Sequence, residues 1–276
     1  SFAGAGTFSF GTSTLVMSGD GTMNIPAGFD VFNLTGGASS KTTTIALPSN
    51  GSDLDVYGTL TVDGGTLTDT NNADVIIRGT APPVVNGSST LENLWRIQNI
   101  SNMTMPATTY NNLLVTSSST CTSGGSMTFN SELEVASGST FNANGNTIIC
   151  YILDMKTGST IDLRNSTLKA KASAGRTFQL LDSTLLSGNS IIQGFDSTKP
   201  VDLFCTSDGN HELVGTLQDC EVQDNGDITV IGSVIRCTFD ESRSNIRQFF
   251  HTLDTQQLLD ADEAGDDDLR LTKPAL

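Results

Sequence analysis

Hydrophobic residues along this chain come in short bursts that alternate with Ser, Thr, Gly and Asn. Leu60-Thr61-Val62, Val75-Ile76-Ile77 and Ile228-Thr229-Val230-Ile231 are examples. Alternation of apolar and polar residues over a few positions indicates a β-strand with one buried face. Because the bursts are rich in β-branched residues and are bounded by turn-forming residues, the pattern predicts an all-β protein with many short strands.

The bursts repeat at a fixed offset in the middle of the chain. Gly138-Ser139-Thr140-Phe141-Asn142-Ala143 aligns with Gly158-Ser159-Thr160-Ile161-Asp162-Leu163, an offset of 20. The match continues where Asn146-Thr147-Ile148 falls on Ser166-Thr167-Leu168. Such a period is too short for a propeller blade or a helical repeat. It suits one coil of a β-solenoid, in which equivalent positions of successive coils stack along an axis.

A second repeated motif has an apolar residue, then Asn or Asp, then Ser or Cys, except that the last copy has Arg236 where the others have Asn or Asp. Its copies lie at 163–168, 180–185, 217–222 and 234–239, at spacings of 17, 37 and 17 residues. We expect the motif at a corner of the coil, because Asn and Asp tolerate unusual backbone angles and a small Ser or Cys can turn inward. Cys220 and Cys237 then occupy the same position of adjacent coils, which permits a disulfide without requiring one.

These patterns predict a parallel β-helix, or β-solenoid, with coils of about 17–20 residues over 51–240. Residues 1–50 are β-like but less regular, and they form either the start of the solenoid or a capping region. Residues 241–276 form a third region, with a short helix and an acidic tail. Caps are expected because the open end of a solenoid exposes strand edges and core.

In the C-terminal region, Phe249 and Phe250 lie at helical spacing with Ile246 and Leu253, which predicts a short amphipathic helix. The helix would cover the last coil or bind a partner. Seven acidic residues follow within 254–268, among them Asp266, Asp267 and Asp268. We expect this tail to contact a basic cluster on a neighbouring subunit. The basic residues of this cluster are Lys156, Arg164, Lys169, Lys171 and Arg176.

The formal net charge of −16 argues against binding to a nucleic-acid backbone and fits an extracellular or virion-exposed surface. No apolar run is long enough for a membrane span. The five cysteines form no CxxC pair, so we predict no metal site and no cofactor, with the cysteines as core residues or one disulfide. The chain opens without Met in repeat-like sequence, so we expect a processed product or a fragment of a longer polypeptide.

Residues 109–149 resemble known repeat proteins. Tyr110-Asn111-Asn112-Leu113-Leu114-Val115, Met127-Thr128-Phe129 and Leu133-Glu134-Val135 are similar to the β-strand-rich repeats of bacterial surface adhesins and to parallel β-helix fibre and tailspike proteins of tailed phages. The resemblance implies a right-handed parallel β-helix, an extracellular or virion location and self-association, often as a trimer.

Catalysis on such a β-helix is the alternative from another class, because lyases and tailspike glycosidases place carboxylates on one exposed sheet. The carboxylates near the repeated corners are Asp182, Asp219, Glu221, Asp224 and Asp227. Asp is also an ordinary corner residue, and we favour that interpretation. His211 is expected in a loop and Trp95 in the core or a subunit interface. We therefore expect a non-enzymatic structural or binding protein, a phage fibre, spike or surface decoration, with an adhesin as the alternative. Its partners would be copies of itself, neighbouring structural proteins, or a host glycan or receptor.

Overall fold

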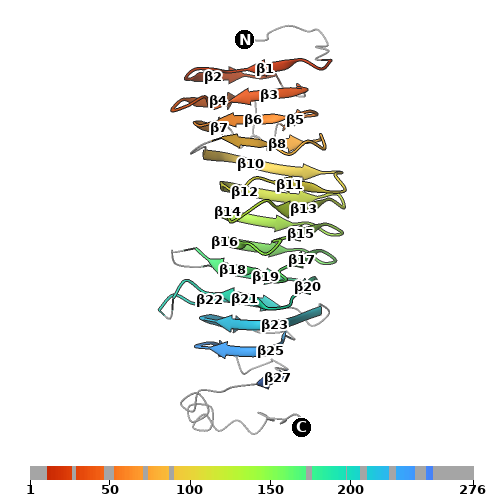
Figure 1. The fold of residues 1–276 in the computed structure, drawn as a ribbon, viewed down its shortest axis with the longest axis vertical. Coiled ribbons are helices and arrows are strands. Elements are labelled where there is room, and N and C mark those ends of the chain that lie inside the picture. The colour runs from red at the N-terminus through yellow and green to blue at the C-terminus, as the bar shows by residue number, and fades with distance from the viewer. Residues whose placement is uncertain are drawn as a thin grey trace.

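The computed structural model shows an elongated stack of short parallel β-strands (Figure 1). It describes residues 11–26, 29–46, 53–70, 74–86, 90–171, 176–196, 198–205, 210–223 and 228–239, and the backbone of 247–250. Every strand pair in this part of the chain is parallel, and each strand pairs with strands roughly one coil before or after it. The predicted all-β parallel solenoid is therefore confirmed.

Three sheets run along the axis, and the chain passes from the first to the second to the third in every complete coil. The first sheet contains β2 (Gly21–Asn24), β4 (Thr42–Ala46), β7 (Thr66–Thr70), the first parts of β10 (Thr90–Gln98), β12 (Thr109–Thr116), β14 (Met127–Val135) and β16 (Thr147–Met155), then β18 (Thr167–Ala170), β21 (Ser190–Gln193) and the second parts of β23 (Asn210–Gln218) and β25 (Ile228–Ile235).

The second sheet continues from the first around one corner. It contains β5 (Asp53–Val56), β8 (Asp74–Ile77), the second parts of β10, β12, β14 and β16, then β19 (Thr177–Leu180), β22 (Val201–Cys205), β24 (Cys220–Gln223) and β26 (Thr238–Phe239).

The third sheet closes each coil. It contains β11 (Met103–Met105), β13 (Thr120–Ser123), β15 (Thr140–Asn142), β17 (Thr160–Asp162), β20 (Thr184–Leu186), the first parts of β23 and β25, and β27 (Arg247–Phe250). At the other end of the stack, β1 (Thr14–Val16), β3 (Asn33–Gly36), β6 (Leu60–Asp63) and β9 (Val84–Asn86) pair with one another in the same parallel way.

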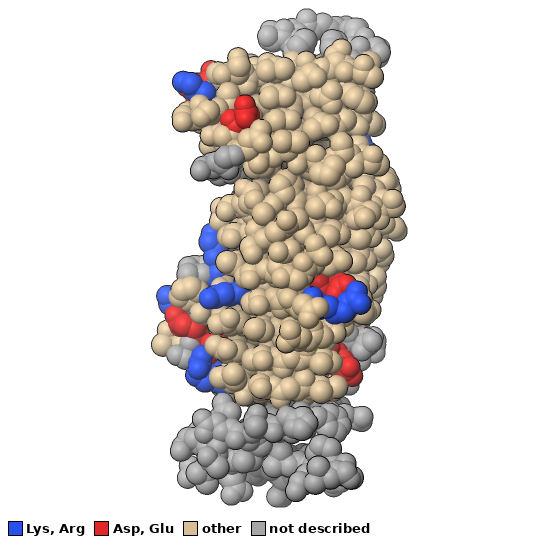
Figure 2. Space-filling view, viewed as in Figure 1, with Lys and Arg blue, Asp and Glu red and all other residues tan. Residues whose placement is uncertain are grey.

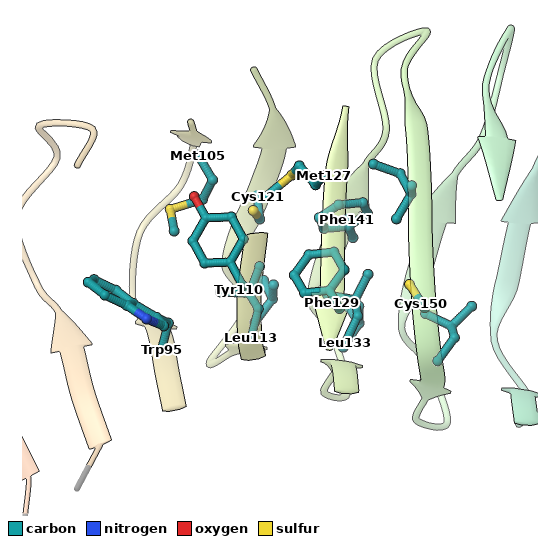
Figure 3. Packing of buried hydrophobic residues seen from close by; sticks show 14 of the residues in the cluster. Trp95, Met105, Tyr110, Leu113, Cys121, Met127, Phe129, Leu133, Phe141 and Cys150 are labelled. Carbon is teal, nitrogen blue, oxygen red and sulfur yellow. The ribbon is translucent and has the colours of Figure 1, made fainter. Parts of the chain in front are cut away.

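The core is a continuous column of side chains enclosed by the three sheets. In most strands alternate residues point inward and are buried, as in β14 and β16. Aromatic rings of four residues from three successive coils pack against one another in the interior (Figure 3). Their centroids are 6.4 Å apart between Trp95 and Tyr110, 5.7 Å between Tyr110 and Phe129, and 6.4 Å between Phe129 and Phe141. Trp95 is fully buried, which places it in the core.

The offset of 20 corresponds to true stacking. Thr140 pairs with Thr160, and Ile148 with Leu168. The buried serines Ser139 and Ser159 precede these threonines at the same corner. Farther along the chain the coils lengthen, and Thr184 pairs with Asn210. The range of offsets exceeds the predicted 17–20 because loops at the corners differ in length.

The second repeated motif occurs at three different corners. Its copy at 163–168 lies between the third and first sheets, and the copy at 180–185 lies between the second and third. The copies at 217–222 and 234–239 both lie between the first and second sheets, where Asp219 and Arg236 are in register. Only this last spacing of 17 is therefore one coil, and the spacings of 17 and 37 before it do not measure coils.

The C-terminal region contributes one described element. Backbone pairing places Arg247–Phe250 in strand β27 beside β25. The remaining residues of the segment with helical spacing, and the acidic tail, lie outside the described residues, so the helix stays a prediction. No helix long and apolar enough to cross a membrane occurs in the described part of the chain.

Candidate functional site

The five basic residues expected to form one cluster lie in different parts of the structure. Lys156 pairs with Asp154 on the second sheet. The Arg164 guanidinium pairs with Asp162, and Arg164 Nε lies 2.9 Å from Asp162 Oδ1. Hydrogen bonding from Arg164 is the main reason that the pKa of Asp162 lies below its usual value. Arg176 is buried. Acidic neighbours two residues away thus already neutralise Lys156 and Arg164.

Lys169 and Lys171 form a different surface at the corner between the first and second sheets. The ammonium groups of Lys169 and Lys199 lie 5.9 and 5.5 Å from the centroid of the Phe195 ring. Lys171 Nζ donates a hydrogen bond to Asn130 Oδ1. On the face seen in Figure 2, charged side chains are sparse and lie mainly along the edges of the molecule. Lys169 and Lys199 thus lie over a partly buried aromatic ring, and the lysines do not form one continuous basic patch.

The other half of the predicted contact cannot be placed. Asp266, Asp267 and Asp268 lie outside the described residues, as do the side chains of Phe249 and Phe250. The contact between the acidic tail and the basic residues of a neighbouring subunit stays a prediction.

Two of the corner carboxylates, Asp219 and Asp182, have structural roles at the corners. Asp219 is buried, and both of its oxygens accept hydrogen bonds from Arg236, at 2.7 and 2.8 Å. Burial raises the pKa of Asp219, but the hydrogen bonds from Arg236 and Gln218 outweigh it, so the pKa lies below its usual value. Asp182 has a left-handed backbone, with φ of 25°. Both residues shape corners, as we favoured from the sequence.

The remaining corner carboxylates include one pair. Glu221 on β24 is the register partner of Asp202 on β22. Burial raises the pKa of Asp202, and the Glu221 carboxylate raises it further. Asp224 and Asp227 lie outside the described residues.

A denser row of carboxylates lies on the second sheet, and sequence reasoning missed it. Glu132 and Glu134 project from the same face of β14, and Asp154 on β16 is the register partner of Glu134. Burial raises the pKa of Glu132, and the charges of Glu134 and Asp154 add to this effect. The alternation of Glu132 and Glu134 was visible in the sequence. Their neighbour Asp154 lies 20 residues after Glu134, and only the strand register shows that the two are adjacent. A carboxyl group with a raised pKa beside other carboxyl groups is an arrangement used in acid–base chemistry.

A second constellation lies where the first and second sheets meet in the last described coils. Asp219 and Cys220 are in register with Arg236 and Cys237 of the next coil. Both cysteines are free, and Cys220 is fully buried whereas Cys237 is only partly buried. The sequence placed these two cysteines at the same position of adjacent coils, and this is confirmed.

His211 differs from its expected place in a loop. It lies in β23, pairs with Leu185 of β20, and is buried. Its Nε2 lies 3.4 Å from the hydroxyl of Ser183, which is also buried. Inward-pointing small polar residues at this corner leave room for an imidazole, so His211 is a core residue.

Among the described residues, no group of three or more His, Cys, Asp or Glu side chains is arranged to hold a metal ion. Comparison with protein-family models, with curated proteins and with solved structures finds no match to this chain.

Proposed function

We propose that this chain is a non-enzymatic structural and binding β-solenoid of a virion or an extracellular assembly, in the manner of a phage fibre, spike or surface decoration. The observation that carries the proposal is the continuous stack of in-register parallel strands around one buried column from β2 to β25. Each coil adds about 4.8 Å along the axis, and its backbone hydrogen bonds run parallel to that axis. Such a stack makes a stiff rod.

The ends of the rod are suited to assembly. Strands at the end of a sheet present unpaired N–H and C=O groups, which another chain can pair with unless they are covered. Proteins built from stacked repeats need caps for the same reason. We infer that neighbouring copies or neighbouring structural proteins cover these ends. The net charge of −16 favours solubility of the long exposed sides.

Immunogold electron microscopy with antibodies against this chain tests the location. Labelling of fibres or spikes on purified virions from the source supports the first proposal. Labelling of the intact cell surface instead supports the alternative, a bacterial surface adhesin. Labelling confined to the cell interior contradicts both. Light scattering on the purified chain, together with negative-stain images, measures whether copies associate into rods or filaments.

A polysaccharide-degrading enzyme is the second candidate, and the Glu132–Glu134–Asp154 row favours it. Glu132 lies diagonally across from Asp154, one strand away and two residues along, which corresponds to about 8 Å and falls within the roughly 6.5–9.5 Å between the two carboxyl groups of an inverting glycosidase. Glu132, with its raised pKa, would be the acid, and Asp154 would be its partner carboxyl group.

Incubation with capsular and cell-wall polysaccharides separates the two classes. An enzyme releases reducing ends, and E132Q abolishes the release whereas E212Q, which alters an exposed residue of β23, does not. Absence of release by the wild-type chain across these polysaccharides contradicts the enzyme and leaves the structural proposal standing.

A further inference from the structure

Cys220 and Cys237 lie one above the other at the corner between the first and second sheets. The register pairs Gln218 with Ile235 before this position and Glu221 with Thr238 after it. The two cysteines between these pairs are therefore direct neighbours in adjacent coils.

The two sulfur atoms have equivalent surroundings and lie close together. Cys220 Sγ is 3.2 Å from the carbonyl oxygen of Gln218, and Cys237 Sγ is 3.4 Å from that of Ile235. Cys237 Sγ also lies 3.5 Å from the carbonyl oxygen of Leu217, in the preceding coil. The thiols of the two cysteines hydrogen bond to each other. Each sulfur therefore lies within reach of the other.

The backbone spacing permits a disulfide. Neighbouring parallel strands are about 4.8 Å apart, and disulfide-linked residues have Cα atoms roughly 4.4–6.8 Å apart. A disulfide also needs Cβ atoms about 3.5–4.5 Å apart.

The ion pair beside the cysteines holds the two coils in register. Arg236, one residue before Cys237, donates both hydrogen bonds to Asp219, one residue before Cys220. Because Asp219 is buried and Arg236 reaches it from the next coil, the pair fixes the relative height of the two corners. The thiols are thus positioned before any bond forms.

The other three cysteines lack such a partner. Cys121 is in register with Phe141, Cys150 with Phe129 and Ala170, and Cys205 with Leu180. All three are buried in the core, and burial raises the pKa of the Cys205 thiol to about 12. Cys237 is only partly buried, so a reagent in solution can reach the pair through it.

We propose that Cys220 and Cys237 form a reversible disulfide that fastens the coil containing β26 to the coil containing β24, with an external disulfide compound as oxidant. The Cys237 thiolate attacks one sulfur of that compound and expels its other half as a thiolate. The Cys220 thiolate then attacks the Cys237 sulfur and expels the second half. The two protons lost by the cysteines go to the two expelled thiolates, and the external disulfide gains the two electrons.

The order of these steps follows from the surroundings of the thiols. The hydrogen bond from Cys220 lowers the pKa of Cys237, whereas the hydrogen bond to Cys237, together with burial, raises the pKa of Cys220. The accessible thiol is therefore also the one that ionises first, and the thiolate is the attacking species.

The bond would act where the stack has least support. In the described part of the chain, β26 pairs with β24 alone. A cross-link between coils removes conformations of the opened coil, so it slows local opening at this end of the rod. This inference depends on the stacking register and not on the proposed location, so each can fail without the other.

The test uses the full chain equilibrated in buffers of reduced and oxidised glutathione. Peptide mass spectrometry without reduction is expected to find Cys220 cross-linked to Cys237, and added dithiothreitol to reverse it. Amide hydrogen exchange in β25 is expected to be about tenfold slower or more in the oxidised chain.

Matched variants identify the pair. C237S and C220S are each expected to abolish the cross-link and the redox dependence of exchange, whereas C205A, which removes a core thiol, keeps both. A glutathione adduct on Cys237 without a cross-link would overturn the proposal. Equal exchange in β25 of the oxidised and reduced chains would overturn it as well.

Discussion

A left-handed residue occurs in every copy of the corner motif. Asn165, Asp182, Asp219 and Arg236 have φ of 57°, 25°, 53° and 49°. Asn and Asp adopt this conformation at lower cost than most residues, because their short polar side chains can hydrogen bond locally. Arg has no such advantage, and its position is supported by the bond to Asp219. The same left-handed turn thus occurs at three different corners of the coil. The spacing between copies of the motif therefore does not give the coil length.

The Asp219–Arg236 pair is expected to stabilise the last described coils in a pH-dependent way. D219N removes the charge from a buried acceptor of three hydrogen bonds and is expected to cost about 1–3 kcal/mol at pH 7. Because the folded pKa of Asp219 is lowered, this stabilisation is present above the ordinary value of 3.8 and is lost as the pH falls through the folded pKa. Denaturant titrations of both proteins between pH 7 and pH 3 measure the effect. A difference that stays constant with pH would contradict it.

Because Phe129 packs against two other aromatic rings, truncation of its side chain is expected to destabilise the core strongly. Its ring packs against the ring of Tyr110 in the preceding coil and against the ring of Phe141 in the next strand of the same coil. F129A leaves a cavity that rigid coils cannot close, and is expected to lower the free energy of unfolding by about 3–5 kcal/mol. Denaturant unfolding measures the loss, and F129L serves as the control because it keeps most of the volume. Equal stability of the two variants would show that the coils collapse around the cavity.

At the scale of strands, β23 and β25 turn a corner without a loop. Gly215 and Gly232 are register partners where the third sheet passes into the first. A Cβ on Gly215 would lie 1.9 Å from the carbonyl oxygen of Ser190, because the backbones of successive coils touch at this bend. Glycine is needed here for close approach.

G215A is therefore expected to be strongly destabilising, by about 2–4 kcal/mol or enough to prevent folding. G19A is the matched control, since a Cβ there meets no atom within 4 Å. Thermal unfolding followed by circular dichroism compares the two variants. If G215A and G19A melt at the same temperature, the coils are farther apart at this bend than the structure shows.

The strands, their parallel stacking and the offset of 20 were predictable, because inward positions must be apolar in every coil and so repeat visibly in the sequence. The lengthened coils were not, since a corner loop changes the spacing without changing the strands. The carboxylate row of Glu132, Glu134 and Asp154 was missed for a related reason. Its members come from two strands, and their pairing register cannot be read from the sequence. Cys220 and Cys237 were found because their corner motif repeats after one coil.

For the whole molecule, stability is expected to decrease from the middle of the stack toward its ends. Each coil is supported by its neighbours, so unfolding of a stacked-repeat protein begins where a neighbour is missing. Hydrogen exchange in β14 and β16 is expected to be slower than in β2 by tenfold or more. Exchange measured at the peptide level over hours checks this gradient. Uniform exchange along the chain would indicate a single cooperative unit.

The variable length of the coils has a consequence for how such a protein changes size. A longer loop at a corner moves outward and leaves the axial rise of its coil at about 4.8 Å. The reach of the rod thus depends on how many coils it contains and hardly at all on how many residues it has. Duplication of one unit of about 20 residues would extend it by roughly 5 Å. Changes at the corners would instead alter what its sides display, so dimension and surface can evolve separately.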